Sequence, residues 1–250
     1  MQRIAIKVSY KGTHYHGWQA QPGTNLTVES QLTRAISLIA NHTIKLTASG
    51  RTDAGVHALE QVCHFDTTAN RNSISWIHGC NKYLPEDIKI LWSKKVDTNF
   101  HARFAATQRT YVYKIYNAAI NSPFYTQSHT WIHTSLNIEQ MQKAMMLFVG
   151  TYNFNAFRSS QCQAHNPHRT IYNARLERRD SFINTTITGN AFLHNMVRNI
   201  MGMVILVGKG KKNIEDIRYM LSHPVRPTGV PTAAPNGLYL AKVDYRDYFN

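Results

Sequence analysis

Hydrophobic and polar positions in the first hundred residues follow two periods. Residues 2–10 alternate with a period of two, which predicts a strand. After Thr27, a residue type that caps helices, apolar residues recur every three or four positions and predict a helix; they are Val28, Leu32, Ala35, Ile36 and Ile39. A second helix should end at Pro85, because proline interrupts helical hydrogen bonding; its apolar positions are Ile74, Ile77 and Leu84. Further strands are expected at residues 44–48, 61–66 and 88–96.

The remainder of the chain repeats this mixture. Residues 103–117 predict a strand with Arg109, Tyr111 and Tyr113 on one face. Asn137 can cap a helix that Gly150 ends in a left-handed turn. The other expected elements are a hairpin of residues 169–179 and 182–188, helices over residues 193–207 and 214–221, and a last strand from residue 237. Helices and strands thus alternate with hairpins, which predicts an α+β fold of two α/β-type halves with mixed, mainly antiparallel sheets, divided into residues 1–100 and 101–250.

Charge is the first feature that points to a partner. The 250 residues contain 28 Lys and Arg against 14 Asp and Glu, a net charge of +14. Such an excess favours a polyanion such as RNA or DNA, although a basic protein without a nucleic-acid partner is the alternative. The basic residues are spread along the chain, so any binding face must be assembled by folding. The three cysteines form no Cys-x-x-Cys pair, and no signal peptide or membrane span is recognisable, so we expect a cytoplasmic protein with reduced thiols.

The segment Ser49–Ala58 contains the strongest candidate for a catalytic residue. Asp53 follows Arg51 in a loop bracketed by Gly50 and Gly55, a setting that can hold a carboxylate with limited freedom. An Asx-turn or a helix-capping role is an equally good interpretation from the residues alone. The sequence therefore nominates Asp53 without deciding its role.

Two further residues are candidates for the same site as this carboxylate. Arg198 lies in an otherwise apolar helical stretch, and a buried cation needs a partner because its desolvation is expensive. Asp53 is an available partner, since Arg can grip a carboxylate with two parallel hydrogen bonds; the alternative is that Arg198 faces solvent or phosphate. Tyr111 offers a ring to a base, or it lines the core.

Six segments, in this order, resemble the tRNA pseudouridine synthase A family over nearly the whole chain. They are Gly12–Gln19, Gly50–Ala58, Phe100–Phe104, Arg109–Tyr113, Asn190–Asn199 and Gly237–Leu240. The resemblance implies that Asp53 is the catalytic aspartate, that Tyr111 packs against the target base and that Arg198 pairs with the aspartate. It further assigns Arg51 and His57, with Tyr111, to substrate binding. The fold it implies has two halves meeting at a central cleft.

The resemblance also implies a reaction and a substrate. Family members isomerise uridine to pseudouridine at positions 38, 39 and 40 of the tRNA anticodon stem-loop, flipping the base to reach a buried acid. They act as homodimers and use no cofactor, because the isomerisation has no redox step. We accordingly expect tRNA and a second copy of the chain as partners, with no membrane, no nucleotide cofactor and no metal.

Three other interpretations compete with this one. A metal site would use Cys162, His165 and His168, with His14 and His16 as further donors, but the spacing is not that of a structural zinc site. A non-catalytic RNA-binding module would share the charge and aromatic content, but it has little reason to bury a carboxylate near phosphates. A nuclease or glycosidase would need a second carboxylate or a metal cluster beside Asp53.

Overall fold

The computed structural model describes residues 1–246 and 248–249 and has an α+β fold. Contacts group the chain into two compact units. Unit 1 contains Met1–Thr107 together with Tyr239–Asn250, and unit 2 contains Gln108–Leu238. The functional division expected at residue 100 stays a prediction. Among the described residues, no helix combines the length and apolar character needed to cross a membrane.

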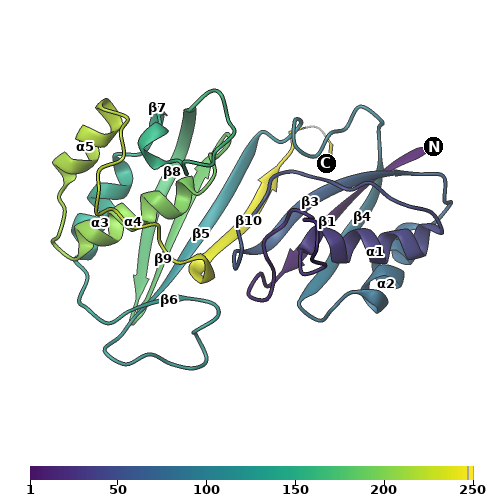
Figure 1. The fold of residues 1–250 in the computed structure, drawn as a ribbon, viewed down its shortest axis with the longest axis horizontal. Helices are drawn as coiled ribbons and strands as arrows, with labels where there is room; N and C mark the ends of the chain where they lie inside the picture. Colours follow the sequence, from purple (N-terminus) through teal and green to yellow (C-terminus); the bar gives the residue numbers. More distant parts are fainter. Residues whose placement is uncertain (247, 250) are drawn as a thin grey trace. The chain divides into compact units, whose positions relative to one another are not determined.

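Unit 1 is built on a mixed sheet in the order β4-β1-β3-β10, with β2 paired to β3 (Figure 1). The strands are β1 (Gln2–Tyr10), β2 (Thr47–Ala48), β3 (His57–Thr67), β4 (Ile88–Val96) and β10 (Leu238–Asp244), of which unit 1 takes Tyr239 onward. β1 is antiparallel to both β3 and β4, whereas β10 runs parallel to β3 through Tyr239 and Leu240. The end of the chain therefore completes a sheet begun by its first strands.

Helices α1 (Val28–Ala40) and α2 (Ser73–Tyr83) accompany this sheet. The Thr27 side chain caps α1 by accepting a hydrogen bond from the Ser30 N–H, as the sequence predicted. The buried face of α1 also matches the predicted period, except that Ala40 is buried in place of Ile39. The prediction for α2 was partly wrong: Ile74 is 66% exposed, and Trp76 instead packs edge-on against Phe65 of β3.

Unit 2 contains an antiparallel series β5-β9-β8-β7, with β6 parallel to β5 (Figure 1). The strands are β5 (Gln108–Asn117), β6 (Thr130–Ile132), β7 (Gly150–Asn153), β8 (His168–Arg179) and β9 (Phe182–Gly189). The helices are α3 (Ile138–Met146), α4 (Met196–Gly208) and α5 (Ile214–Ser222), with short 3₁₀ turns at Asn155–Phe157 and Pro235–Gly237. The predicted β8–β9 hairpin is confirmed, and it turns at Asp180 with φ 51°.

Two local predictions were wrong: the strand expected from residue 103 begins only at Gln108, and the end of α3 lies elsewhere. Gly150 does not cap a helix: α3 ends at Met146, and Gly150 begins β7 with φ 130°. The Asn137 cap of α3 is confirmed, because its side chain accepts from the Gln140 N–H at 3.0 Å. Helix ends are set by tertiary hydrogen bonds as well as by residue type. The sequence therefore predicts where α3 starts but not where it ends.

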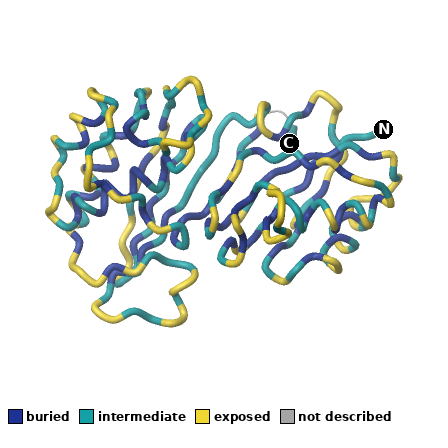
Figure 2. Tube along the Cα trace, in the orientation of Figure 1, coloured by how far each residue is buried: buried dark blue, intermediate teal, exposed yellow. Residues whose placement is uncertain are grey.

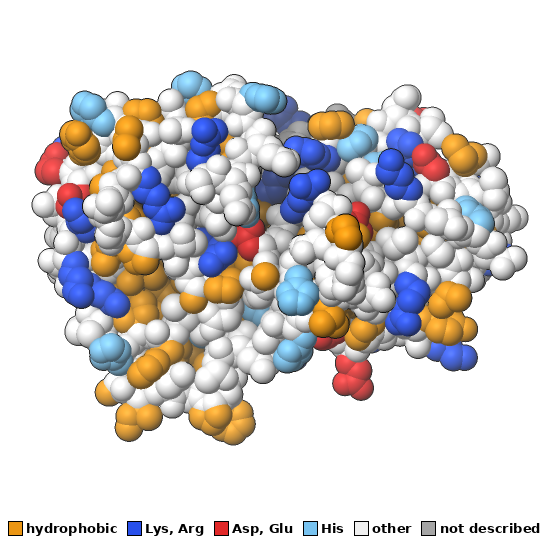
Figure 3. Space-filling view, viewed as in Figure 1, with side chains coloured by type: hydrophobic (Ala, Val, Ile, Leu, Met, Phe, Trp, Pro, Cys, Tyr) orange, Lys and Arg blue, Asp and Glu red, His pale blue; other side chains and the backbone are white. Residues whose placement is uncertain are grey.

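The core of each unit follows the alternation in its strands and helices. Buried positions lie along the strands and the inward faces of the helices in both units (Figure 2). On the face shown in Figure 3, Lys, Arg and His side chains are spread over the surface and acidic side chains are few. The positive charge is thus a property of folded surfaces and not of one basic tail, as the sequence predicted.

Candidate active site

Asp53 lies in the loop that joins β2 to β3, and its side chain is half-buried. The neighbouring Arg51 is exposed. Of the two glycines thought to shape this loop, only Gly55 requires its freedom, because its φ is 77°. A Cβ on Gly50 would meet no atom within 4 Å, and the φ of Gly50 is not in the left-handed region. The loop is therefore shaped by its surroundings more than by a pair of glycines.

The start of the loop is held by a buried amide. Gln61 on β3 is fully buried, and its Nε2 donates to the Gly50 carbonyl oxygen at 2.8 Å. Its Oε1 accepts from the Ser49 hydroxyl and from the Val62 N–H. One side chain thus holds two successive loop residues, four and three positions before Asp53.

The rest of the loop packs against residues 12–18 at backbone distance. A Cβ on Gly12 would lie 1.9 Å from the Val56 carbonyl oxygen, and one on Gly17 would lie 2.7 Å from the Thr52 carbonyl oxygen. The Trp18 N–H also donates to the Thr52 oxygen, at 3.0 Å. Only glycine permits such close contact between main chains. The segment therefore fixes the backbone on both sides of Asp53.

His57 belongs to the same assembly. The ring is 2% exposed, and its Nδ1 accepts a hydrogen bond from the Gly12 N–H at 3.0 Å. The ring stacks on Tyr239 of β10 with centroids 4.6 Å apart. Burial raises the pKa of the Tyr239 hydroxyl to about 12. Because Nδ1 is an acceptor here, the imidazole carries its proton on Nε2.

Tyr111 is placed by the regular geometry of unit 2. It lies on β5 opposite Ile187 of β9, and its ring meets Phe192 edge-on at 5.1 Å. Two residues along, Tyr113 is buried, and its hydroxyl bonds to Thr130 at 2.6 Å and to the Ala234 carbonyl oxygen at 2.9 Å. Burial raises the pKa of Tyr113 to about 12. Tyr113 is thus a core residue, whereas Tyr111 remains half-buried.

Arg198 lies in the first turn of α4, and its side chain is half-buried. Its Nε donates to the Ala233 carbonyl oxygen at 2.8 Å, and its Nη1 donates to Asn195 Oδ1 at 3.1 Å. The Ala233 N–H returns a hydrogen bond to the Arg198 carbonyl oxygen. These contacts orient the guanidinium within unit 2, and its pairing with Asp53 stays a prediction.

The predicted site residues therefore divide between the units. Asp53, Arg51 and His57 lie in unit 1, and Tyr111 and Arg198 lie in unit 2. Gln61 was missed from the sequence, although a glutamine at an inward position of a strand is a signal that could have found it. Gly12 and Gly17 were noted only as part of a shared motif, and their contact with the Asp53 loop could not be read from it.

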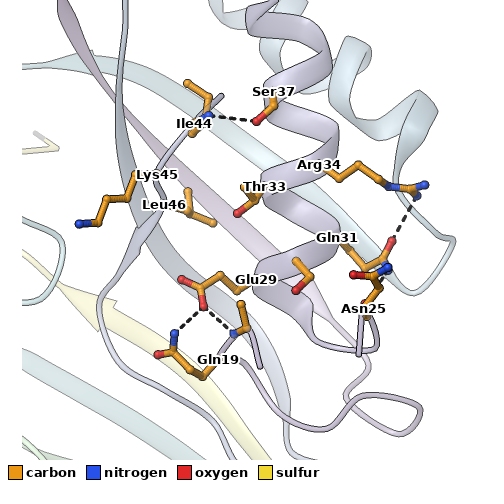
Figure 4. A pocket seen from close by; sticks show the side chains of 12 residues that line it. Gln19, Asn25, Glu29, Gln31, Thr33, Arg34, Ser37, Ile44, Lys45 and Leu46 are labelled. Carbon is orange, nitrogen blue, oxygen red and sulfur yellow. Dashed lines mark hydrogen bonds between the residues drawn. The ribbon is translucent and has the colours of Figure 1, made fainter. Parts of the chain in front are cut away.

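A separate groove of about 640 Å³ lies beside α1 and does not include Asp53 (Figure 4). At one end Glu29 accepts hydrogen bonds from Gln19 Nε2 at 2.9 Å and from the Ala20 N–H at 2.7 Å. At the other end the Ile44 N–H donates to the Ser37 hydroxyl. Glu29 thus ties the start of α1 to the residues that follow Trp18. Within residues 1–246 and 248–249, no group of three or more His, Cys, Asp or Glu side chains is arranged to hold a metal ion.

Comparison with known proteins places the chain in a family. The family model for tRNA pseudouridine synthase matches residues 6–105 and 144–246. The chain is 43% identical to tRNA pseudouridine synthase A of Paraburkholderia phytofirmans, covering 100% of this chain and 92% of that protein. It is also 43% identical to the Neisseria meningitidis protein of the same name, covering 99% and 94%.

A solved Cbf5-Nop10-Gar1 complex aligns with 81% of this chain and 44% of that chain, at 12% identity and a TM-score of 0.39, a likeness too low to support an inference. The family model and the relatives, by contrast, span both units. The chain belongs to the tRNA pseudouridine synthase family, whose members are isomerases that act on tRNA.

Proposed function

We propose that this protein isomerises uridine to pseudouridine at positions 38, 39 and 40 of the tRNA anticodon stem-loop, with Asp53 as the catalytic carboxylate. The observation that carries the proposal is the immobilised loop around Asp53. Backbone contacts from Gly12 and Gly17 and the amide of Gln61 hold this loop from two sides. A carboxylate that needs no further ordering before reaction is what positioned catalysis requires. The choice of stem-loop positions comes from the family resemblance.

The reaction conserves the atoms of the nucleotide. The bond from N1 to C1′ breaks, the base turns, and C1′ forms a bond to C5. The proton on C5 is lost and N1 gains one, so nothing is oxidised and no cofactor is consumed. Asp53 must be ionised to act as a nucleophile or as a base, and a nearby cation favours that form. In the proposal, Arg198 supplies the cation.

The remaining predicted residues serve substrate binding, Tyr111 and Arg51 directly and His57 indirectly. Tyr111 packs its ring against the flipped base, which compensates for lost stacking in the RNA. Arg51, exposed beside Asp53, holds the strand by its phosphates. His57 contributes indirectly, because its buried ring accepts a hydrogen bond from the Gly12 N–H and so supports the segment that packs against the Asp53 loop.

The working enzyme is proposed to be a cytoplasmic homodimer that binds tRNA. The net charge of +14 supports the RNA partner, since cations neutralise phosphates and release counterions. The dimer comes from the family resemblance. Light scattering at micromolar concentration should give twice the mass of the chain, and a monomeric mass would contradict the dimer.

The decisive experiment compares Asp53→Asn with wild type. Asparagine keeps the size and removes the charge, so the rate of tritium release from tRNA labelled at uridine C5 should fall by about 10²–10⁴-fold. Glu86→Gln, an exposed carboxylate in the same unit, is the matched control and should keep the wild-type rate. Chemical mapping should place the product at positions 38–40. A wild-type rate in Asp53→Asn, or product at other positions only, would overturn the proposal.

A further inference from the structure

The segment Lys11–His16 presents a row of exposed nitrogen donors. Lys11, His14 and His16 are exposed, whereas Gly12 and Tyr15 between them are buried. The Tyr15 hydroxyl anchors the segment by donating to Asp87 at 2.6 Å. The buried residues thus hold the backbone while the exposed ones face solvent. Neither the family resemblance nor the proposed reaction gives these three side chains a role.

The position of the segment is fixed relative to Asp53. Gly12 contacts Val56, the Gly55 N–H donates to the Tyr15 carbonyl oxygen at 3.4 Å, and Gly17 contacts the backbone at Asp53. The segment therefore runs alongside residues 52–56 of the Asp53 loop, with His16 next to Gly17, which meets the Asp53 backbone. All of these contacts lie within unit 1, so they hold for this unit by itself.

Two carboxylates close to this segment already accept hydrogen bonds. Asp87 accepts from Tyr15, and Glu29 accepts from Gln19 Nε2 and the Ala20 N–H. Arg51 is exposed on the Asp53 loop itself. The outward-facing groups along the two segments are therefore mostly donors of hydrogen bonds, which suits an anionic ligand with many acceptor oxygens.

We propose that Lys11, His14 and His16 bind the sugar–phosphate backbone of the RNA strand that carries the target uridine. This inference rests on the proposed function, because it uses Asp53 to locate that uridine. Lys11 contributes a full charge, and each imidazole contributes at least one N–H in any protonation state. Contacts to phosphate position the RNA without reading its sequence. A metal role for His14 and His16 is not needed, since two donors on one segment leave the coordination of zinc incomplete.

The test measures RNA affinity over a range of salt concentrations. Lys11→Gln, His14→Gln, His16→Gln and the triple variant are titrated against a labelled anticodon stem-loop hairpin and against full-length tRNA. Each single variant should weaken binding by about 3- to 10-fold and the triple variant by about 30-fold or more. Lys11→Gln should also make the dependence of log affinity on log salt shallower by roughly 0.7–0.9. The loss should be equal for hairpin and full tRNA.

Matched controls lie on α2 of the same unit. Lys82→Gln and His78→Gln remove the same groups from exposed positions, and they should bind within twofold of wild type. The inference is overturned if the triple variant binds like wild type, if the controls lose as much, or if only full-length tRNA shows the loss. Thermal unfolding of each variant separates lost contacts from lost structure.

Tritium release distinguishes this inference from the proposed function. A wild-type protein that makes no pseudouridine at positions 38–40 contradicts the proposed function, while the affinities still decide whether the row binds phosphate. An active wild type with an unaffected triple variant contradicts this inference alone. With saturating RNA, the triple variant should keep kcat within about threefold and raise KM, because its groups grip the backbone and do not touch the reacting atoms.

Discussion

The Asp53 loop of unit 1 and the Arg198 helix of unit 2 hold their functional side chains by opposite means. The Asp53 loop has no regular structure and depends on Gln61 and on close main-chain contact with Gly12 and Gly17. Arg198 lies on a regular helix and is oriented by the carbonyl oxygen of Ala233. A loop needs many specific contacts to fix a side chain, whereas a helix supplies its own backbone order.

This difference predicts which unit loses the position of its functional side chain more easily when a contact is removed. In unit 1, removing the buried amide of Gln61 would free Ser49 and Gly50, which begin the loop that carries the proposed catalytic Asp53. In unit 2, losing the contact between Arg198 and the Ala233 carbonyl oxygen would leave the backbone of α4 in place. Gly202, four residues after Arg198 on α4, makes an equally close approach, because a Cβ on it would lie 1.9 Å from the Pro231 carbonyl oxygen.

The largest expected effect comes from adding a methyl group at these close approaches. In Gly12→Ala and Gly202→Ala the new Cβ would lie 1.9 Å from a main-chain carbonyl oxygen. Each substitution should lower the free energy of unfolding by about 3 kcal/mol, because backbone must shift to relieve the overlap. Urea unfolding followed by circular dichroism measures the change.

Gly50→Ala is the matched control for this pair. Its Cβ would meet nothing within 4 Å, and its φ is ordinary, so stability should change by less than about 0.5 kcal/mol. A loss at Gly50 as large as at Gly12 would show that the loop itself, and not the contact with residues 12–18, is the sensitive feature.

The next effect separates stability from activity. Gln61→Glu removes the N–H donor to the Gly50 oxygen and places a carboxylate against that oxygen, which should cost about 2 kcal/mol. The Asp53 loop should move with it, so kcat should fall by at least about tenfold with the Kd for tRNA unchanged. Single-turnover kinetics and binding titration measure the two quantities.

Gln142→Glu in unit 2 is the comparison, since the Gln142 Oε1 accepts from the Leu176 N–H at 2.8 Å, far along the chain from both Asp53 and Arg198. It should change stability little and leave kcat unchanged, because a carboxylate still accepts that bond. Equal losses of kcat in both variants would show that the Asp53 loop is no more sensitive to a lost contact than the rest of the fold.

The smallest expected effect is a difference in acid sensitivity between the units. Burial, helped by the charges of Arg3 and His101, lowers the pKa of His64 in unit 1 to about 4. The unfolded chain protonates this histidine near 6.5, so stability present above that pH is lost as pH falls toward 4. Burial and Lys114 also lower the pKa of His129 in unit 2.

Native-state hydrogen exchange between pH 7 and 4.5 measures the two units separately. Unit 1 should lose protection first, and His64→Gln should flatten its pH dependence in this window. Asp66→Asn should lower stability by a constant amount above about pH 3.8 and should change the pH dependence only below it, because the hydrogen bond from Arg3 lowers the pKa of Asp66 and its contribution is lost as pH falls through that lowered value. Earlier loss in unit 2 would reverse the expected order.

The sequence by itself determined most of the regular elements and, through its motifs, the family. Period-two and helical patterns located β1 and α1, and the side chains of Thr27 and Asn137 marked helix starts because caps are local interactions. The α+β class and the family followed from patterns and motifs, and both were confirmed. Asp53 was nominated because a carboxylate between glycines is visible in sequence.

Only the tertiary structure decided what surrounds Asp53. The roles of Gln61, Gly12 and Gly17 depend on strands and loops that meet after folding, and no local pattern records the distance between two main chains. The same reason explains the errors at Gly50 and Gly150, where residue type was taken as a sign of backbone geometry. Local interactions act between neighbours in sequence, whereas close packing acts between neighbours in space, and the Asp53 loop is built almost entirely by the second.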